Sequence, residues 1–469
     1  MPTAPNISTP RFRLRHAALA MLPVLAALSG CQFQQHREEL ALMAARGETA
    51  RALATLDDPK VQSLYSEADR LVYDLDRGSL LFYAQRDAEA ISQLDRAEAT
   101  IDRQREPTAA DTATKWLLND AAATYVGEPY EDIYTNVFKL MAYLRQEQLD
   151  GRATVEARRI LGKTTWLRDR FVASQSETQR EAEQRTSGKS IEAPEAIASP
   201  TTAGQFIDSP LGTYLTAVTM MKVGEDQVQA VAARRLTDAI QRQQGIIGPV
   251  QAEKFAALET LRPADANVLL IGLSGRGPIK FAQRFGPIPL GDIPIYFELP
   301  QLRDYQSEAD GIRMTLTPVG PTTAAPQEIT LSFIEDLGRV ATENHRRQMP
   351  LIYARTFIRA AVKSAASFAV TESIRKGQGG PRRRSNDEAL LSTVVGLAAI
   401  AATERADVRC WTFLPGEAYV GLASVPPGTY AVRAEYLRGS QVLYRDDEAQ
   451  ITIRPGDTAL STYISRWWR

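Results

Sequence analysis

The spacing of hydrophobic residues along the chain changes at about residue 263. Between residues 35 and 262, apolar residues recur three and four positions apart among many Ala, Leu, Arg, Glu and Gln residues, which is the spacing of amphipathic helices. After Pro263, short apolar runs are separated by Gly and Pro, a pattern typical of strands and turns. The sequence therefore predicts an α+β fold, with an all-helical region over 31–262 and a β-rich domain over 263–469.

Three stretches of the helical region carry the residue spacing of TPR repeats, in which small residues let paired helices pack closely. These stretches contain, in order, Gly78, Leu81, Ala90, Leu94 and Ala97; Leu140, Leu144, Ala153 and Ala157; and Tyr214, Ala232, Leu236 and Ala239. They lie further apart than the regular period of about 34 residues. We therefore predict a TPR-like stack with extra helices, including one over 111–125, and a flexible insertion over 176–205, where large apolar residues are few. A generic Ala-rich helical bundle is the alternative.

An Ala-rich segment over 335–403 interrupts the β-rich domain and predicts an inserted helical hairpin. Its most apolar run, 389–402, is shorter than the ~20 residues that a membrane-spanning helix needs. Small residues on both predicted helices favour close packing, so we expect the hairpin to be buried against the sheet. The alternative is an apolar element that meets a membrane or a partner.

Two short glycine-containing motifs predict turns rather than sites. GEPYED, residues 127–132, places a proline at the start of an apolar helical run. The glycines of GLSGRG, residues 272–277, match neither of the phosphate-binding spacings. We expect a turn before a helix at the first motif and a hairpin turn at the second.

Residues 1–30 have the organisation of a bacterial lipoprotein signal peptide. Three arginines precede an apolar run over 17–28, and the sequence LSGC then ends at Cys31. We expect cleavage before Cys31 and acylation of that residue, palmitate included; an ordinary secretory signal is the alternative. Gln32 follows the cysteine, which by resemblance to Gram-negative lipoproteins favours the outer membrane. The mature chain is then expected to be lipid-anchored and to face the periplasm.

The composition narrows the possible chemistry. The chain has 55 Lys and Arg residues against 56 Asp and Glu residues, and no strongly basic region that would indicate nucleic acid as the partner. Acylation of Cys31 leaves Cys410 without an intramolecular partner, and Cys410 is expected to be a small buried core residue rather than a reactive thiol. No H-x-x-x-H or C-x-x-C motif is present, so we expect neither a metal site nor a cofactor.

Candidate contact residues lie in two charge-rich stretches, and no catalytic constellation stands out. His345, the one credible base histidine, lies in the basic segment ENHRRQMP and is expected at the surface. The partner-binding candidates are Arg382, Arg383 and Arg384 at the hairpin tip, and Glu404, Arg405, Asp407, Arg409 and Trp411 after the hairpin. The arginines predict a solvated loop or a contact with an anionic surface. For the second group we favour a structural ion-pair network that ties the helix to the next strand, with recognition of a partner as the alternative.

The order of these features resembles a family of Gram-negative TPR-type outer-membrane lipoproteins. The resemblance covers nearly the whole mature chain and rests on the lipobox, GEPYE, ARTFIRAAVKSAA, GLAAIAATERADVRCWTFLP and VPPGTYAVR. Such proteins are often encoded beside a lipoprotein activator of penicillin-binding proteins, and the family carries no established catalytic residues. The resemblance therefore implies a role in the cell envelope.

We expect a non-enzymatic scaffold or regulator of cell-wall assembly. Its TPR-like helices would bind an envelope protein, and its β-rich domain would dock on an envelope component such as the cell wall. One alternative is a hydrolase or lyase that acts on cell-wall glycan or peptidoglycan with paired carboxylates. Another is an accessory component of an envelope export system that oligomerises through the 351–402 hairpin.

Overall fold

The computed structural model describes residues 34–104, 124–149, 151–186, 208–250, 252–290, 293–320, 325–346, 405–456 and 458–469, with single residues between 349 and 360. Helices occupy the N-terminal half of the chain and strands the C-terminal half. The predicted change of structure at about residue 263 is therefore confirmed. Across these ranges, the chain forms no helix with the length and hydropathy that crossing a membrane requires.

Pairs of consecutive helices joined by short turns build the N-terminal half. The helices are one over residues 34–45, α2 (Thr49–Leu56), α3 (Pro59–Gln62), α4 (Arg70–Tyr83), α5 (Asp87–Gln104), α7 (Pro129–Arg145), α8 (Gly151–Thr186), α9 (Pro210–Val223), α10 (Asp226–Ile247) and α11 (Glu253–Ala256). The pairs α4–α5, α7–α8 and α9–α10 pack against each other. A Cβ added at Gly78 of α4 would come within 2.6 Å of Leu94 Cδ2 on α5, so this glycine permits the close approach of the first pair.

The described strands of the C-terminal half form three sheets. The inner sheet has the order β10 (Ser461–Trp467), β1 (Val268–Ser274), β7 (Glu417–Ala423) and β6 (Ser332–Asp336). The outer sheet has the order β5 (Gln327–Thr330), β4 (Gly311–Pro318), β8 (Gly428–Arg438) and β9 (Gln441–Ile453). A two-stranded arm consists of β2 (Arg276–Leu290) and β3 (Ile293–Tyr305). Within the inner sheet β1 pairs parallel with β10 and antiparallel with β7.

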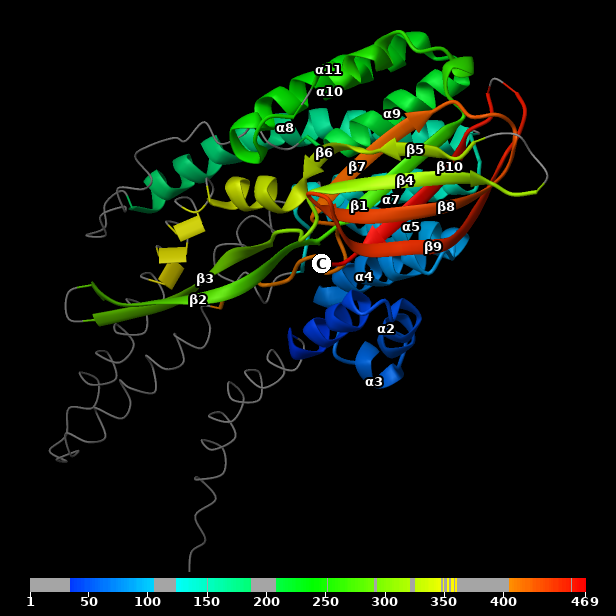
Figure 1. Ribbon diagram of the computed structural model, residues 1–469. Helices are drawn as coiled ribbons and strands as arrows, with labels where there is room; N and C mark the ends of the chain where they lie inside the picture. The colour runs from blue at the N-terminus through cyan, green and yellow to red at the C-terminus, as the bar shows by residue number, and fades with distance from the viewer. Residues whose placement is uncertain are drawn as a thin grey trace, which may run out of the picture.

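The inner sheet lies between the outer sheet and the helices, so that the body has three layers (Figure 1). Every residue of β1 is buried. Val268 and Leu270 pack in the core shared with the outer sheet, and Leu269 and Ile271 pack in the core shared with the helices. Because successive side chains of a strand point to opposite faces, a strand covered on both faces reads as a continuous apolar run. That requirement explains the sequence VLLIGL.

The helices α7 and α9 are the inner helices of their pairs. All residues of α7 from Glu131 to Leu144 and all residues of α9 from Pro210 to Lys222 are buried. Helix α7 contacts β10, and α9 contacts β6, whereas α5 and α10 have buried and exposed positions in alternation. The inner sheet therefore covers the inner face of the helical layer.

Two expectations about connecting segments were wrong. Gly275, with φ +65°, ends β1, but β2 pairs with β3 in a different sheet. GLSGRG is thus a turn between sheets and not a hairpin. Helix α8 extends to Thr186, so residues 176–186 of the expected flexible insertion are helical; Ala, Glu, Gln and Arg in this stretch are strong helix formers.

Several predicted segments lie outside the described residues. These are the signal peptide and Cys31, residues 111–123 of the helix predicted over 111–125, residues 187–205 of the insertion, and 361–403 of the Ala-rich hairpin; Thr124 and Tyr125 are described and are not helical. Of the segment predicted as a hairpin, Glu335 and Asp336 belong to β6, and a helix covers 337–346. The predicted turn at GEPYED is confirmed, with Gly127 at φ +79° and α7 beginning at Pro129.

The arm formed by β2 and β3 extends away from the three-layered body (Figure 1). Phe297 and Leu299 on one of its faces are buried, and they pack in a small core with Phe357 and Ala360. Near the body, Phe281 is exposed. One face of the arm is therefore covered around Phe297, whereas Phe281 is exposed near the point where β2 leaves the body.

Candidate functional site

The segment that leads into β7 inserts between the helices and joins the two halves of the chain. Trp411 is 1% exposed, and its backbone N–H donates to Glu131 Oε1 at 2.6 Å. Its indole Nε1–H donates to Ser79 Oγ on α4 at 3.0 Å, and its ring lies 5.2 Å from that of Phe138 on α7. A single residue thus connects α4 and α7 to the strand region.

The next residue of this segment is bound by a second buried carboxylate. Thr412 N–H donates to Asp76 Oδ1 at 2.7 Å, and its hydroxyl donates to Asp76 Oδ2 at 3.0 Å. Arg37, from the helix over 34–45, donates to the same hydroxyl and lies 3.7 Å from Asp76. Burial raises the pKa of Asp76 to about 6. Cys410, which this segment also contains, is buried, so the expectation of a buried core cysteine is confirmed.

The predicted charge cluster around residues 404–411 is part of this junction. Arg409 is buried, donates to both carboxylate oxygens of Asp407 at 2.8 Å, and donates to the Ala68 carbonyl at 3.2 Å. These contacts form an ion-pair network that joins the segment before β7 to the helical half. The hairpin helix, which the network was predicted to tie to the next strand, lies outside the described residues. Arg409 and Trp411 are both too deeply buried for a separate molecule to reach. Arg405 and Asp407 are partly exposed, and Arg382, Arg383, Arg384 and Glu404 lie outside the described residues.

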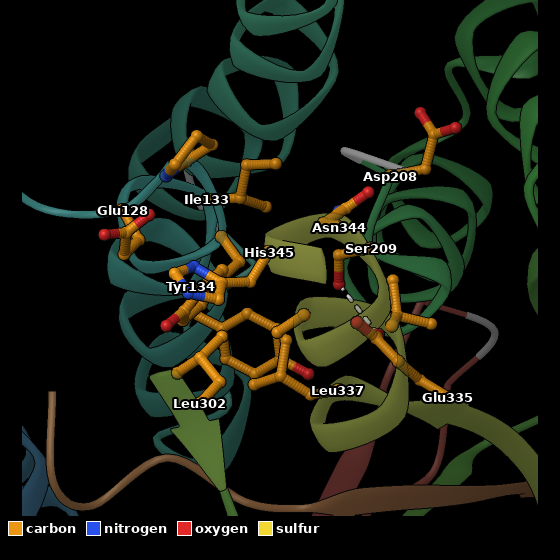
Figure 2. A pocket seen from close by; sticks show the side chains of 14 residues that line it. Glu128, Ile133, Tyr134, Asp208, Ser209, Leu302, Glu335, Leu337, Asn344 and His345 are labelled. Carbon is orange, nitrogen blue, oxygen red and sulfur yellow. Dashed lines mark hydrogen bonds between the residues drawn. The ribbon is translucent and has the colours of Figure 1, made fainter. Parts of the chain in front are cut away.

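A narrow cavity between α7, the start of α9 and the helix over 337–346 brings together several titratable groups (Figure 2). Its lining includes Glu128, Tyr134, Ser209, Glu335 and His345. The space that the centre of a water molecule can occupy is about 30 Å³, which suffices for only one or a few waters. As it stands, the cavity has no room for a sugar ring.

Glu335 is the most strongly engaged acid of this cavity. Its Oε2 accepts from Ser209 Oγ and from Leu211 N–H, both at 2.8 Å, so the carboxylate of β6 caps the first turn of α9. Ser209 Oγ in turn accepts from Gly212 N–H at 3.0 Å. Burial raises the pKa of Glu335 to about 7. The N-terminal end of a helix favours a negative charge, but the surrounding protein excludes the water that would otherwise solvate it.

Glu128 and His345 lie on the other side of the cavity (Figure 2). Glu128 forms an ion pair with buried Lys280 of β2, and although burial opposes it, this lysine lowers the pKa of Glu128. His345 is partly buried, with Nε2 at 2.8 Å from the Pro300 carbonyl, and burial lowers its pKa. The expectation of a surface histidine was therefore wrong, because β3 packs against the helix over 337–346 and shields the ring.

A third group of acids surrounds a lysine. Oxygens of Asp95, Glu98 and Glu156 lie within 4.8 Å of one another, a spacing that could hold a metal ion. Lys139 Nζ lies 2.9, 2.6 and 3.0 Å from these three carboxylates and is fully buried. Lys163 pairs with Glu98 at 2.8 Å, and Arg159 pairs with Glu98 and Glu156 at 3.2 and 3.1 Å. These cations supply the positive charge that the acids require, so this cluster joins α5, α7 and α8.

Sequence reasoning missed Glu128, Glu131 and Glu335. A signal was available for the first two, because GEPYED begins a helix with Pro129 and places an acid at its third position, and Glu131 does accept from Glu128 N–H at 2.9 Å. For Glu335 no local signal exists, since Ser209 is 126 residues away.

Comparison with known proteins adds no relative from which a function could be transferred. No protein-family model, curated protein or solved structure was found to match the chain.

Proposed function

We propose that the chain is a non-enzymatic lipoprotein, anchored through Cys31 in the outer membrane and facing the periplasm, that acts as a scaffold or regulator in cell-envelope assembly. In this proposal its helix pairs are irregular TPR-like repeats, related to the Gram-negative lipoproteins that the sequence resembles. An envelope protein binds the helical layer, and the strand region contacts a further envelope component.

The inner face of the helical layer is not the partner surface in this proposal. In a solenoid the concave face usually binds the partner, but here the chain's own inner sheet and the segment around Trp411 cover that face. The partner surface is instead the outer face of α8 and α10. Arg235 of α10 donates to the Leu161 carbonyl of α8 at 3.1 Å, so these two helices form one continuous surface.

The observation that carries the proposal is a set of exposed apolar side chains on that surface. Val155 and Trp166 of α8 are 45% and 36% exposed, and Val231 of α10 is 38% exposed. Val155 and Trp166 are eleven positions apart, which at 3.6 residues per turn places them on one face of the helix. Exposed apolar residues that gather on one surface are typical of sites that bind other proteins.

Crosslinking in intact cells, followed by purification of the membrane-bound protein, tests the proposal. We expect one or a few envelope proteins to be recovered with the wild-type chain and to be lost with Trp166→Ala or Val155→Ser. Val319→Ser is the matched control, since Val319 is 47% exposed but follows β4 in the outer sheet. Equal recovery with all variants would exclude this surface. If the measured mass of the purified chain showed no attached fatty acid, the proposed lipid anchor at Cys31 would be refuted.

A second candidate function, cell-wall hydrolysis, is favoured by one observation. Glu128 and Glu335 line the same cavity, with the pKa of one lowered and that of the other raised to about 7, and acid–base pairs of enzymes often differ in this way. Their engagement with Lys280, Ser209 and Leu211 argues for a structural role. Release of soluble fragments from purified cell wall by the wild-type chain, but not by Glu335→Gln, would favour the enzyme.

A further inference from the structure

The base of the arm and the start of the helix over 34–45 enclose an open groove. Its lining includes Gln34, Gln35, Phe281, Arg303 and Tyr305, and it holds about 300 Å³. We call this site the tether groove, because Gln34 is only three residues after Cys31. The residues that line it come from the N-terminal helix and both strands of the arm, and the segment before β7 closes its floor.

An arginine lies over an aromatic ring on each face of the arm. Arg303 lies over the ring of Phe281, at 5.2 Å from its centroid, and both side chains are exposed. Further out along the arm and on its opposite face, Arg284 lies over the ring of Tyr296 at 5.4 Å. No ion pair links either arginine to a carboxylate of the described residues. Arginine beside an aromatic ring suits the boundary between lipid headgroups and acyl chains, where a guanidinium binds phosphate and a ring enters the apolar region.

The length of the tether places this groove at the membrane. A chain spans at most about 3.6 Å per residue, so a lipid on Cys31 lies no more than ~11 Å from Gln34. We propose that the tether groove and the base of the arm dock on the phospholipid surface that holds the acylated Cys31, with Arg303 bound to a lipid phosphate and Phe281 inserted among the acyl chains. The inference rests on the lipid anchor of the proposed function and adds the orientation of the body.

The charges around the groove define the kind of lipid. Glu38 and Glu39 lie on the first turns of the helix over 34–45, with 50% and 61% of their side chains exposed. Glu38 pairs with Arg276 at 3.5 Å, and Glu39 offsets the charge of Arg303, so the surface has little net attraction for an anionic membrane. The contact therefore requires the phosphodiester that zwitterionic phospholipids also carry, rather than a negatively charged headgroup.

Fluorescence at a single introduced cysteine tests the orientation in the full lipidated protein. The natural Cys410 is buried, so a polarity-sensitive dye reacts at Gln283→Cys on the arm or at the control Val319→Cys on the outer sheet. The protein is placed in vesicles of phosphatidylcholine and phosphatidylethanolamine, with and without a lipid-borne quencher. We expect emission at position 283 to shift to the blue and to be strongly quenched, and emission at position 319 to stay unchanged.

Changes in the groove extend the test. Phe281→Ala together with Arg303→Ala should abolish most of the quenching at position 283, while the urea concentration that unfolds the chain stays the same. Quenching that is absent at position 283 in a protein shown by mass to be acylated would overturn the orientation alone. A protein without acyl chains would overturn both the orientation and the anchor. A blue shift at position 283 that requires added envelope protein rather than lipid would also overturn the phospholipid assignment.

Discussion

Replacement of Trp411 tests whether the two halves of the chain form one folding unit. The side chain is 1% exposed, contacts the ring of Phe138 and donates to Ser79 Oγ. Truncation of a buried Trp to Ala typically costs about 3–5 kcal/mol, and loss of the indole hydrogen bond alone costs about 1 kcal/mol. We therefore expect Trp411→Ala to lower the free energy of unfolding by about 3–5 kcal/mol and Trp411→Phe to lower it by about 1–2 kcal/mol.

Urea unfolding of the Cys31→Ser chain, followed by circular dichroism and by tyrosine and tryptophan fluorescence, measures these values. The control is Trp166→Ala, because Trp166 is 36% exposed and its removal should change the free energy of unfolding by less than 1 kcal/mol. Helical and aromatic signals should be lost in one transition for the wild type. A change for Trp411→Ala no larger than that for Trp166→Ala would refute the assignment of Trp411 as the link between the halves.

Three further predictions follow from the buried polar groups and the close contacts between layers. The pKa of Glu335 is raised to about 7 from 4.5, so between these values the folded chain binds more protons at this residue than the unfolded chain. Its contribution to stability should therefore fall as pH rises from about 4.5 to 7. Because burial also raises the pKa values of Asp76, Glu131 and Glu417 into this range, Glu335→Gln should reduce the pH dependence in urea titrations and not remove it. Gly272→Ala should lower the free energy of unfolding by about 1–3 kcal/mol, because the added Cβ would lie 2.5 Å from Ile312 Cδ1. The control is Gly311→Ala on β4, whose added Cβ meets no atom within 4 Å and should leave the free energy of unfolding nearly unchanged. Lys139→Met should lower stability at pH 7, but by less than the ~3–5 kcal/mol of an uncompensated buried charge, because Lys163 and Arg159 still pair with Glu98 and Glu156. Part of that loss should be regained in acid, and an equal effect at pH 7 and pH 4 would contradict this reasoning.

The sequence was most informative where the fold depends on local periodicity. The helical spacing before Pro263 and the Gly- and Pro-separated apolar runs after it located the change from helices to strands. The packed position of Gly78 against Leu94 also follows from a local spacing. Both features depend on residues that are near each other in the chain, which is the range over which a periodic pattern carries information.

The junction between the halves could not be predicted from such patterns. The hydrogen bond from Trp411 to Glu131 joins residues 280 positions apart, and no periodicity links the two. The ATERADVRCW stretch did indicate a dense charge cluster. The partners of Arg409 in the helical half, the Ala68 carbonyl and the Asp69 carboxylate, lie 341 and 340 positions away, and no local pattern links them to it. Contacts between residues so far apart in the chain depend on how the surfaces of whole helices and sheets fit together.

The covered inner face of the helical layer constrains how the protein can act as a scaffold. Because α7 and α9 are buried between the inner sheet and the outer helices, neither can open to admit a peptide without exposing the core that includes Trp411. Binding at the outer face of α8 and α10 needs no such rearrangement. A rigid body on a tether of three residues would then hold that outer face at a nearly fixed height and angle above the membrane, which a flexible linker could not do. The short tether and the buried junction therefore serve the same purpose in the proposed function: they fix the position of the partner relative to the bilayer.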